Sequence, residues 1–214
     1  MEEIRFDGLG ARERFGLLLA SAETQAPPAR VYTATVPGRD GSLDLSECFG
    51  RVFYDDRTAV FTFLVPQGRE EAFRTAADLR RLLHGRTVDI ARSGLPGVHL
   101  RGRVSVGALT ACGGWWKIRL TCACGPFYLA DALSSSVFYS TGGGGETRTV
   151  VNAGDIPVTP DIIVSGTDPW TVNGTDYPVG TSTAHFALDP GENTVTAVTD
   201  GLGACEIVYR EVRL

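Results

Sequence analysis

The sequence contains no long hydrophobic run, and this absence argues against a membrane-spanning helix among its 214 residues. A helix that crosses a bilayer needs about 20 consecutive apolar residues, whereas the apolar stretch nearest the N-terminus covers only Phe15–Ala22. Glu2, Glu3 and Glu13 precede that stretch, where a secretory leader carries positive charge. We therefore expect a chain that is made in the cytosol and not exported by a secretory route.

Cysteine and histidine are scarce, which removes several kinds of site chemistry. The five cysteines are irregularly spaced: Cys48, Cys112, Cys122, Cys124 and Cys205. Their odd number does not fit a disulfide framework, so we expect free thiols in a reducing compartment. Cys122 and Cys124 lie two residues apart and not in a Cys-x-x-Cys motif, which favours side-by-side packing on a strand. His84, His99 and His185 lack metal-binding spacing, so the sequence predicts no metal and no cofactor.

Catalytic motifs are also missing. No Gly-x-Ser-x-Gly nucleophile motif occurs. The glycine run Gly142–Gly145 is followed by Glu146-Thr147 and not by Lys-Ser/Thr, so it does not form a phosphate-binding loop. Asp40, Asp55 and Asp56 fit turn positions better than a pair of catalytic carboxylates. We predict no catalytic residue and no enzyme, and a cell-wall hydrolase is the least favoured function.

Charge is distributed unevenly along the chain. Residues 1–130 hold 17 Lys and Arg against 14 Asp and Glu, whereas residues 131–214 hold 3 against 11. Because contacts to phosphate need clustered cations, this acidic second part argues against specific nucleic-acid binding. An acidic surface that keeps the protein soluble is the simpler explanation.

One helix stands out in a chain that otherwise predicts strands. Arg69–Leu83 places Ala72, Ala76, Leu79 and Leu83 on a single face, with acidic residues in the first turn and basic residues in the last. The strands expected around it are Ile4–Phe6, Phe15–Leu19, Val31–Val36, Arg51–Tyr54, Val60–Val65, Val88–Ala91, Val98–Val106 and Trp115–Cys124. A turn at Pro37–Gly41 and a hairpin turn at Asp55-Asp56-Arg57 join some of these strands.

The last of these strands alternates cleanly. Trp116, Ile118, Leu120, Cys122 and Cys124 face one way, while the intervening residues face the other. With the strand that precedes it, this strand forms a long hairpin over residues 98–124. We expect this hairpin to be the element that reaches a neighbouring subunit.

Composition changes at residues 134–147, which are rich in Ser and Gly and predict a linker between two domains. The expected domains are therefore residues 1–133 and 148–214. Short strands broken by turn residues follow the linker: Arg148–Val151, Asp161–Ser165, Trp170–Val172, His185–Leu188, Asn193–Val198 and Ala204–Arg210. The predicted fold is mainly β with one helix: an N-terminal β-sandwich with the helix and the long hairpin, then a small C-terminal β-sandwich.

An ordered series of segments gives the chain a family resemblance. The segments are Val36–Leu45, Val52–Arg57, Leu82–Gly85, Gly102–Val104 and Cys124–Tyr128. In this order and spacing they resemble the distal tail proteins of long-tailed, non-contractile phages, over residues 1–130. Asn152–Asp155, Thr159–Val164 and Leu188–Asn193 resemble a shortened form of the galectin-like C-terminal domain of the same family. Hub proteins of contractile tails are the related alternative.

The resemblance implies a ring, generally hexameric, at the tip of the tail tube in the virion. One side of the ring would dock on the tail tube protein and the other would meet the tail-associated fibre or lysin protein. The C-terminal domains would carry receptor-binding proteins, and the tape-measure protein and DNA would pass through the bore. Synthesis would take place in the cytoplasm of the bacterial host.

Basic and aromatic residues of the helix and the closing strand are candidate subunit contacts, with a solvated surface as the alternative for the basic ones. They are Arg69, Arg74, Arg80, Arg81, Trp115, Lys117 and Arg119. Trp170 is a candidate contact to a sugar or to a partner, since a sugar ring could stack on it, and a core or edge residue is the favoured alternative. A carbohydrate-binding module that attaches a particle to a host surface is therefore the alternative function.

Overall fold

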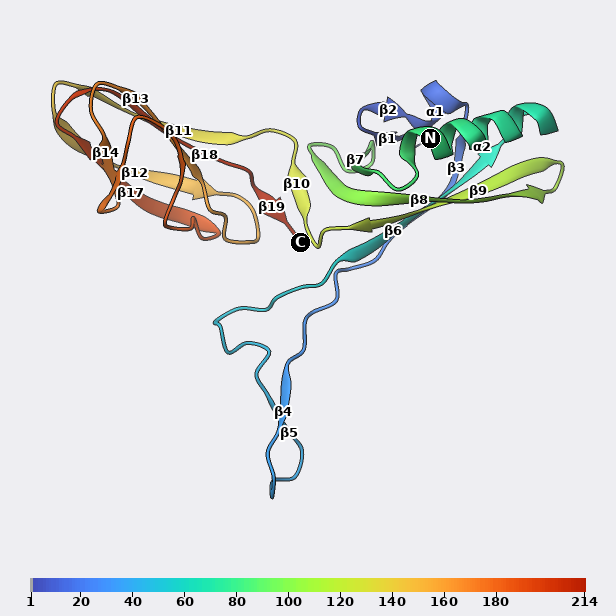
Figure 1. The fold of residues 1–214 in the computed structure, drawn as a ribbon, viewed down its shortest axis with the longest axis horizontal. Helices are drawn as coiled ribbons and strands as arrows, with labels where there is room; N and C mark the ends of the chain where they lie inside the picture. The colour runs from blue at the N-terminus through green and yellow to red at the C-terminus, as the bar shows by residue number, and fades with distance from the viewer. Residues whose placement is uncertain (1) are drawn as a thin grey trace. The chain divides into compact units, whose positions relative to one another are not determined.

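An antiparallel sheet with strand order β2-β1-β7-β8-β9-β6-β3 forms the framework of residues 1–128, as a computed structural model shows for residues 2–214 (Figure 1). Its strands are β1 (Ile4–Phe6), β2 (Leu9–Gly10), β3 (Leu18–Thr24), β6 (Arg57–Val65), β7 (Thr87–Arg92), β8 (Val98–Cys112) and β9 (Trp115–Cys124). The predicted strand at Val60–Val65 is central, because β6 pairs with β9 on one side and with β3 on the other. The mainly β fold is confirmed.

Helix α2 (Arg69–Leu83) has the predicted bounds. Its buried residues are the predicted series Ala72, Ala76, Leu79 and Leu83, which enter the same hydrophobic core as the sheet. The chain leaves the helix through Gly85 at φ 76°, a conformation that costs glycine little. The Gly85 N–H then donates to the Val104 carbonyl, 2.8 Å away. The helix therefore covers the sheet face on which β8 and β9 bury their apolar residues.

The hairpin formed by β8 and β9 (hereafter the hairpin) turns at Gly113 and Gly114, both at positive φ. The predicted alternation of β9 is confirmed: Ile118, Leu120, Cys122 and Cys124 are buried, and the residues between them are exposed or half-buried. A bulge between Val106 and Leu109 interrupts the ladder before the tip.

The N-terminal prediction is partly wrong. Residues expected as a strand at Phe15–Leu19 instead end helix α1 (Ala11–Phe15) and begin β3. Gly16 at φ 66° stops the helix, and its N–H donates to the Arg12 carbonyl. A single glycine after Phe15 therefore ends the helix before the apolar residues of β3 begin.

Residues 25–56 form an extension between β3 and β6, which we call the arm (Figure 1). It contains the two-stranded ladder of β4 (Thr33–Thr35) and β5 (Ser42–Asp44). The predicted strand Arg51–Tyr54 is wrong, because Tyr54 makes only an isolated bridge to Ala29. The predicted hairpin turn Asp55-Asp56-Arg57 is wrong too, because Arg57 already pairs within β6.

Two four-stranded sheets form the second unit, residues 129–214. One sheet consists of β11 (Ser134–Thr141), β18 (Leu202–Tyr209), β13 (Asp161–Gly166) and β16 (Gly180–Thr183). The other consists of β12 (Gly144–Asn152), β17 (Gly191–Thr199), β14 (Trp170–Val172) and β15 (Thr175–Tyr177). Two short strands, β10 (Tyr128–Ala130) and β19 (Val212–Arg213), pair with each other. The predicted small sandwich is therefore present.

The predicted linker at residues 134–147 is wrong, because these residues belong to β11 and β12. Each strand finds its partner late in the chain: β11 pairs with β18, and β12 pairs with β17. The boundary between the units falls after Tyr128. The predicted strand His185–Leu188 is reduced to a bridge between Leu188 and Val158. None of the helices within residues 2–214 is long and apolar enough to span a membrane.

Candidate interaction surfaces

The buried cysteines have the properties of packing residues. Burial, together with the neighbouring Cys124, raises the pKa of Cys122 to about 12. Burial likewise raises the pKa values of Cys124 and Cys205 to about 11. A reactive cysteine needs a lowered pKa, so these thiols are suited to packing and not to redox chemistry. Within residues 2–214 no three His, Cys, Asp or Glu side chains gather as metal ligands.

Arg57 is a charged residue inside the first core. Its side chain is 4% exposed, and its guanidinium carbon lies 4.7 Å from the centre of the Tyr128 ring. Nε and Nη2 of Arg57 find no hydrogen-bond acceptor within residues 2–214. A cation stacked on an aromatic face is partly compensated by the ring quadrupole. Arg57 thus closes the end of the core where β6 begins.

The arm is held in shape by its own hydrogen bonds. The Leu45 N–H donates to the Tyr32 carbonyl at 2.7 Å, and the Tyr32 N–H donates to the Ser46 hydroxyl oxygen at 3.0 Å. At the base of the arm, Arg30 and Asp55 form an ion pair of 2.6 Å. Hydrogen bonds from the Ser46 hydroxyl and then from its N–H lower the pKa of Asp44. The arm is therefore a structured element and not a loose connection.

Large apolar side chains of the arm are exposed. They are Val31, Tyr32, Val36, Leu43, Leu45 and Phe49. Phe49 is 78% exposed, the highest value among the exposed large hydrophobic residues. A pocket of about 430 Å³ lies beside it, lined by Arg30, Tyr32, Leu45, Cys48, Phe49 and Phe53. Clustered apolar exposure of this kind marks an interaction surface.

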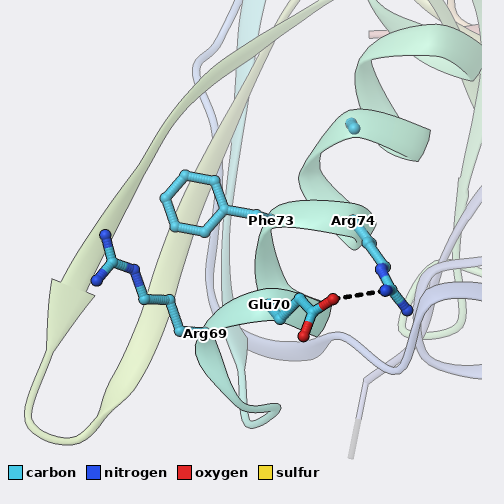
Figure 2. Close-up of a pocket in the computed structure, with 5 residues that line it drawn as sticks. Arg69, Glu70, Phe73 and Arg74 are labelled. Atoms are coloured by element: carbon cyan, nitrogen blue, oxygen red, sulfur yellow. Dashed lines mark hydrogen bonds and ion pairs between the residues drawn. The ribbon is translucent and has the colours of Figure 1, made fainter.

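A second apolar surface lies on helix α2, and we call it the helix patch: Arg69, Glu70, Phe73, Arg74 and Ala77 (Figure 2). These five residues line a pocket of about 620 Å³. Phe73 is 50% exposed, and its ring meets Trp116 of β9 edge-on at a centroid distance of 5.5 Å. The Arg69 guanidinium carbon lies 5.9 Å from the centre of the Phe73 ring. Arg74 is held by Glu70 at 2.6 Å.

The structure divides the predicted contact residues into separate groups. Arg69 and Arg74 line the helix patch. Arg80 donates to the Gly107 carbonyl at 3.2 Å, and Arg81 pairs with Asp78 at 3.0 Å. Trp115 is 43% exposed at the end of the hairpin.

Lys117 and Arg119 are exposed on the β9 face that points away from the buried residues, and thus away from α2. The structure does not join them to the helix patch. Sequence reasoning missed Phe73, whose signal is an aromatic residue on the helix that falls outside the buried i, i+4 series. It also missed Phe49.

Trp170 is a core residue, so the prediction that it contacts sugar is wrong. Its side chain is 2% exposed and packs in the second core. The same core contains Ile162 and Ile207 of the other sheet, so Trp170 faces the interior of the sandwich. A sugar ring cannot stack on a tryptophan that the protein itself covers.

The two extensions of the first unit differ in charge. The hairpin, residues 98–124, contains three arginines and one lysine but no Asp or Glu. The arm, residues 25–56, contains three arginines and five acidic residues. Surfaces whose net charges are opposite in this way attract one another at short range.

The chain resembles a solved structure. No family model matches the chain, and no curated protein sequence matches it. The crystal structure of the SPP1 Dit protein (gp 19.1) matches with a TM-score of 0.73 at 16% sequence identity, and the match covers 100% of both chains. That protein is described as a paradigm of the hub adsorption apparatus in phages that infect Gram-positive bacteria. At this identity the likeness establishes the fold.

Proposed function

We propose that the chain is a distal tail protein, a structural component that forms a ring at the tip of a phage or prophage tail. The observation that carries the proposal is the fold likeness to a hub protein over the full length of both chains. The ordered series of segments in residues 1–130 supports the same conclusion from the sequence alone, independently of the fold. Fold alone does not establish function, so the surfaces of this chain must also fit the role.

The surfaces fit a closed ring. A ring of identical subunits needs two different faces on each subunit, because every contact joins unlike surfaces. The arm and the helix patch are two such unlike surfaces, and both expose apolar residues. A role without catalysis agrees with the absence of catalytic motifs in the sequence.

The partners in this proposal are those of a tail hub. Copies of the chain form the ring, with a hexamer as the expected state. The tail tube protein would bind one side and the tail-associated fibre or lysin protein the other, with the tape-measure protein in the bore. The protein would be made in the host cytoplasm and end at the virion tail tip.

The second unit would carry the receptor-binding proteins. Its sheets expose Val151 and Leu202, side chains that a bound module would cover. The carbohydrate-binding alternative has lost its candidate residue, since Trp170 is buried. We therefore do not retain it as a second function.

Light scattering after size exclusion, with negative-stain imaging of the same peak, tests this proposal. We expect a species near six times the 22.9 kDa chain mass, with a central hole. A monomer at micromolar concentration that also fails to assemble when the tail tube protein is added would contradict the proposal.

A further inference from the structure

Two apolar surfaces of the first unit lack an explained role once the fold is complete. One is the arm tip, which we define as residues 31–50, and the other is the helix patch. Neither is needed to close the core that the sheet shares with α1 and α2. Exposed aromatic residues at two separate places therefore point to a contact made between molecules.

We propose that the arm tip of one copy docks on the helix patch of the next copy, with Phe49 as the apolar anchor. This inference rests on the proposed function and names the contact that would close the ring. The occupant of the patch is thus a second copy of this chain. Three observations carry the choice: the presentation of Phe49, the composition of the patch and the charge of the two partners.

Phe49 is presented by a rigid base. Its ring meets Phe53 edge-on at a centroid distance of 6.3 Å, and the Arg51 guanidinium carbon lies 4.6 Å from the centre of the Phe53 ring. The Cys48 N–H donates to the Leu45 carbonyl at 3.1 Å, and the Gly50 N–H donates to the Glu47 carbonyl at 2.9 Å. A side chain fixed in this way loses little conformational entropy on docking.

The helix patch offers a site of matching chemistry. Phe73 (Figure 2) and Ala77 supply apolar surface. Trp116 of β9 supports the Phe73 ring. Arg69 and Arg74 stand at the rim. An aromatic anchor surrounded by a charged rim is the usual composition of an energetically important contact.

Charge favours a second copy as the occupant. The arm tip carries one arginine (Arg39) and three acidic residues (Asp40, Asp44 and Glu47). The helix patch carries two arginines (Arg69 and Arg74) against one acidic residue (Glu70). Glu47 lies two residues from Phe49 and is exposed, so it is placed to pair with Arg69 of the next copy. Like-charged surfaces would repel, and these attract.

Two single variants, each at an exposed aromatic residue, test the contact directly. Phe49→Ala removes the anchor and leaves the helix patch intact, whereas Phe73→Ala does the reverse. We expect each variant alone to lose the ring and run at the monomer mass. Mixed in equal amounts, they should form a dimer of twice 22.9 kDa, because one intact arm tip then meets one intact patch.

Tyr139→Ala is the matched control. Tyr139 is 69% exposed and lies in the second unit, so its loss removes a similar aromatic area without touching the proposed contact. We expect this variant to keep the ring. Far-UV circular dichroism and thermal melting of all three variants should match the unchanged chain.

A cross-link places the contact at residue level. Cys48 is exposed in the arm, and Ala77→Cys puts a second thiol in the helix patch. With Cys112→Ser in the background, mild copper-phenanthroline oxidation should convert assembled protein into a ladder of disulfide-linked multimers on a non-reducing gel. The same protein carrying Cys48→Ser should remain a single band.

The outcomes separate this inference from the proposed function. Rings that persist in both Phe49→Ala and Phe73→Ala overturn the contact and leave the hub function standing. Loss of the ring in both variants without a dimer in the mixture also overturns it, and would assign the two surfaces to other tail proteins. An unchanged chain that never assembles, alone or with the tube protein, contradicts both.

Discussion

The arm and the hairpin are two extensions of the same unit, and they differ in where their apolar residues lie. Along the hairpin, Val104, Val106, Ile118 and Leu120 are buried in the core beneath α2. Along the arm, the large apolar residues of the tip remain exposed. An extension that buries its own apolar face is part of the fold, whereas one that leaves it exposed is available to a partner.

The same comparison holds for charge. The hairpin has only basic residues among its charged positions, and the arm is acidic on balance. One subunit therefore carries both halves of a complementary pair on different elements. Such an arrangement favours head-to-tail contacts between copies over contacts between identical faces.

The largest expected effect is on stability and separates the two extensions sharply. Ile118→Ala removes a buried side chain of the hairpin, and we expect it to lower the free energy of unfolding by about 2–5 kcal/mol. Val31→Ala in the arm should change it by less than about 0.5 kcal/mol, because Val31 is 69% exposed. Urea denaturation followed by circular dichroism measures both, and equal effects would contradict the comparison.

Alkaline pH should act through the cysteines of the hairpin. Folding raises the pKa values of Cys122 and Cys124 from 9.0 to about 12 and about 11. Their contribution to stability is full below pH 9. It falls between pH 9 and about 12 for Cys122 and between pH 9 and about 11 for Cys124, because the unfolded chain releases protons that the folded chain retains. Each thiol contributes a slope of about 1.4 kcal/mol per pH unit.

Denaturation midpoints at pH 8, 9 and 10 check this prediction. Cys122→Ala should flatten the decline above pH 9, although it also leaves a small cavity that shifts all the midpoints. The arm variant Cys48→Ser is the control, since Cys48 is exposed and should leave the slope unchanged. An unaltered slope in Cys122→Ala would show that the buried thiol does not titrate as proposed.

Thiol labelling should distinguish the arm from the tip of the hairpin in the assembled protein. Cys48 and Cys112 are both exposed, so both should react with iodoacetamide in the monomer at pH 8. In the ring, Cys48 should react only while the contact is open. A contact that is favoured by about 1.4 kcal/mol of binding free energy therefore slows the labelling of Cys48 by about tenfold. Peptide mass spectrometry at successive times gives both rates, and the monomeric Phe49→Ala variant supplies the unprotected rate for each thiol.

Shortening the hairpin tests the role that the sequence analysis gave to it. Deletion of Gly107–Gly114 removes the hairpin tip while leaving the buried half of β9 in place. Besides the arm, the hairpin is predicted to contact a neighbouring subunit. We therefore expect the deletion protein to fold but to remain monomeric. Size exclusion of the deletion protein measures this, and intact rings would limit the intersubunit role to the arm.

The smallest effect is expected at the C-terminal half of α2. Arg81 pairs with Asp78 on the solvent side of the helix, and it does not line the helix patch. Arg81→Ala should change stability by less than about 0.5 kcal/mol and leave the ring intact. Loss of the ring in this variant would move the contact surface along the helix.

Local patterns were enough for the elements whose structure is decided locally. The bounds of α2 follow from its apolar series and from the charges at its ends, and both could be read from residues within one helical length. The alternation of β9 likewise follows from a sheet with one buried face. Arg69 and Arg74 were placed on a surface for the same reason.

The remaining features depend on residues that lie far away in the sequence, so local patterns could not predict them. Ser134–Thr141 has the composition of a linker, yet it forms a strand because β18, more than 60 residues later, pairs with it. Trp170 is buried because residues of the opposite sheet, such as Ile207, which lies far away in the sequence, pack with it in one core. The exposure of Phe49 and Phe73 could not be predicted either, because it depends on which elements fail to cover them.

The arm also has a consequence for how the chain folds. Thr24 of β3 pairs with Ala59 of β6, so the whole arm must be looped out before these two strands can meet. Closing a loop costs entropy that rises by about 0.6 kcal/mol for each doubling of its length, and such distant pairings slow the search for the native topology. A subunit with a shortened arm should therefore fold faster and be slightly more stable as a monomer. The full-length arm is retained at the expense of the isolated subunit's own folding rate.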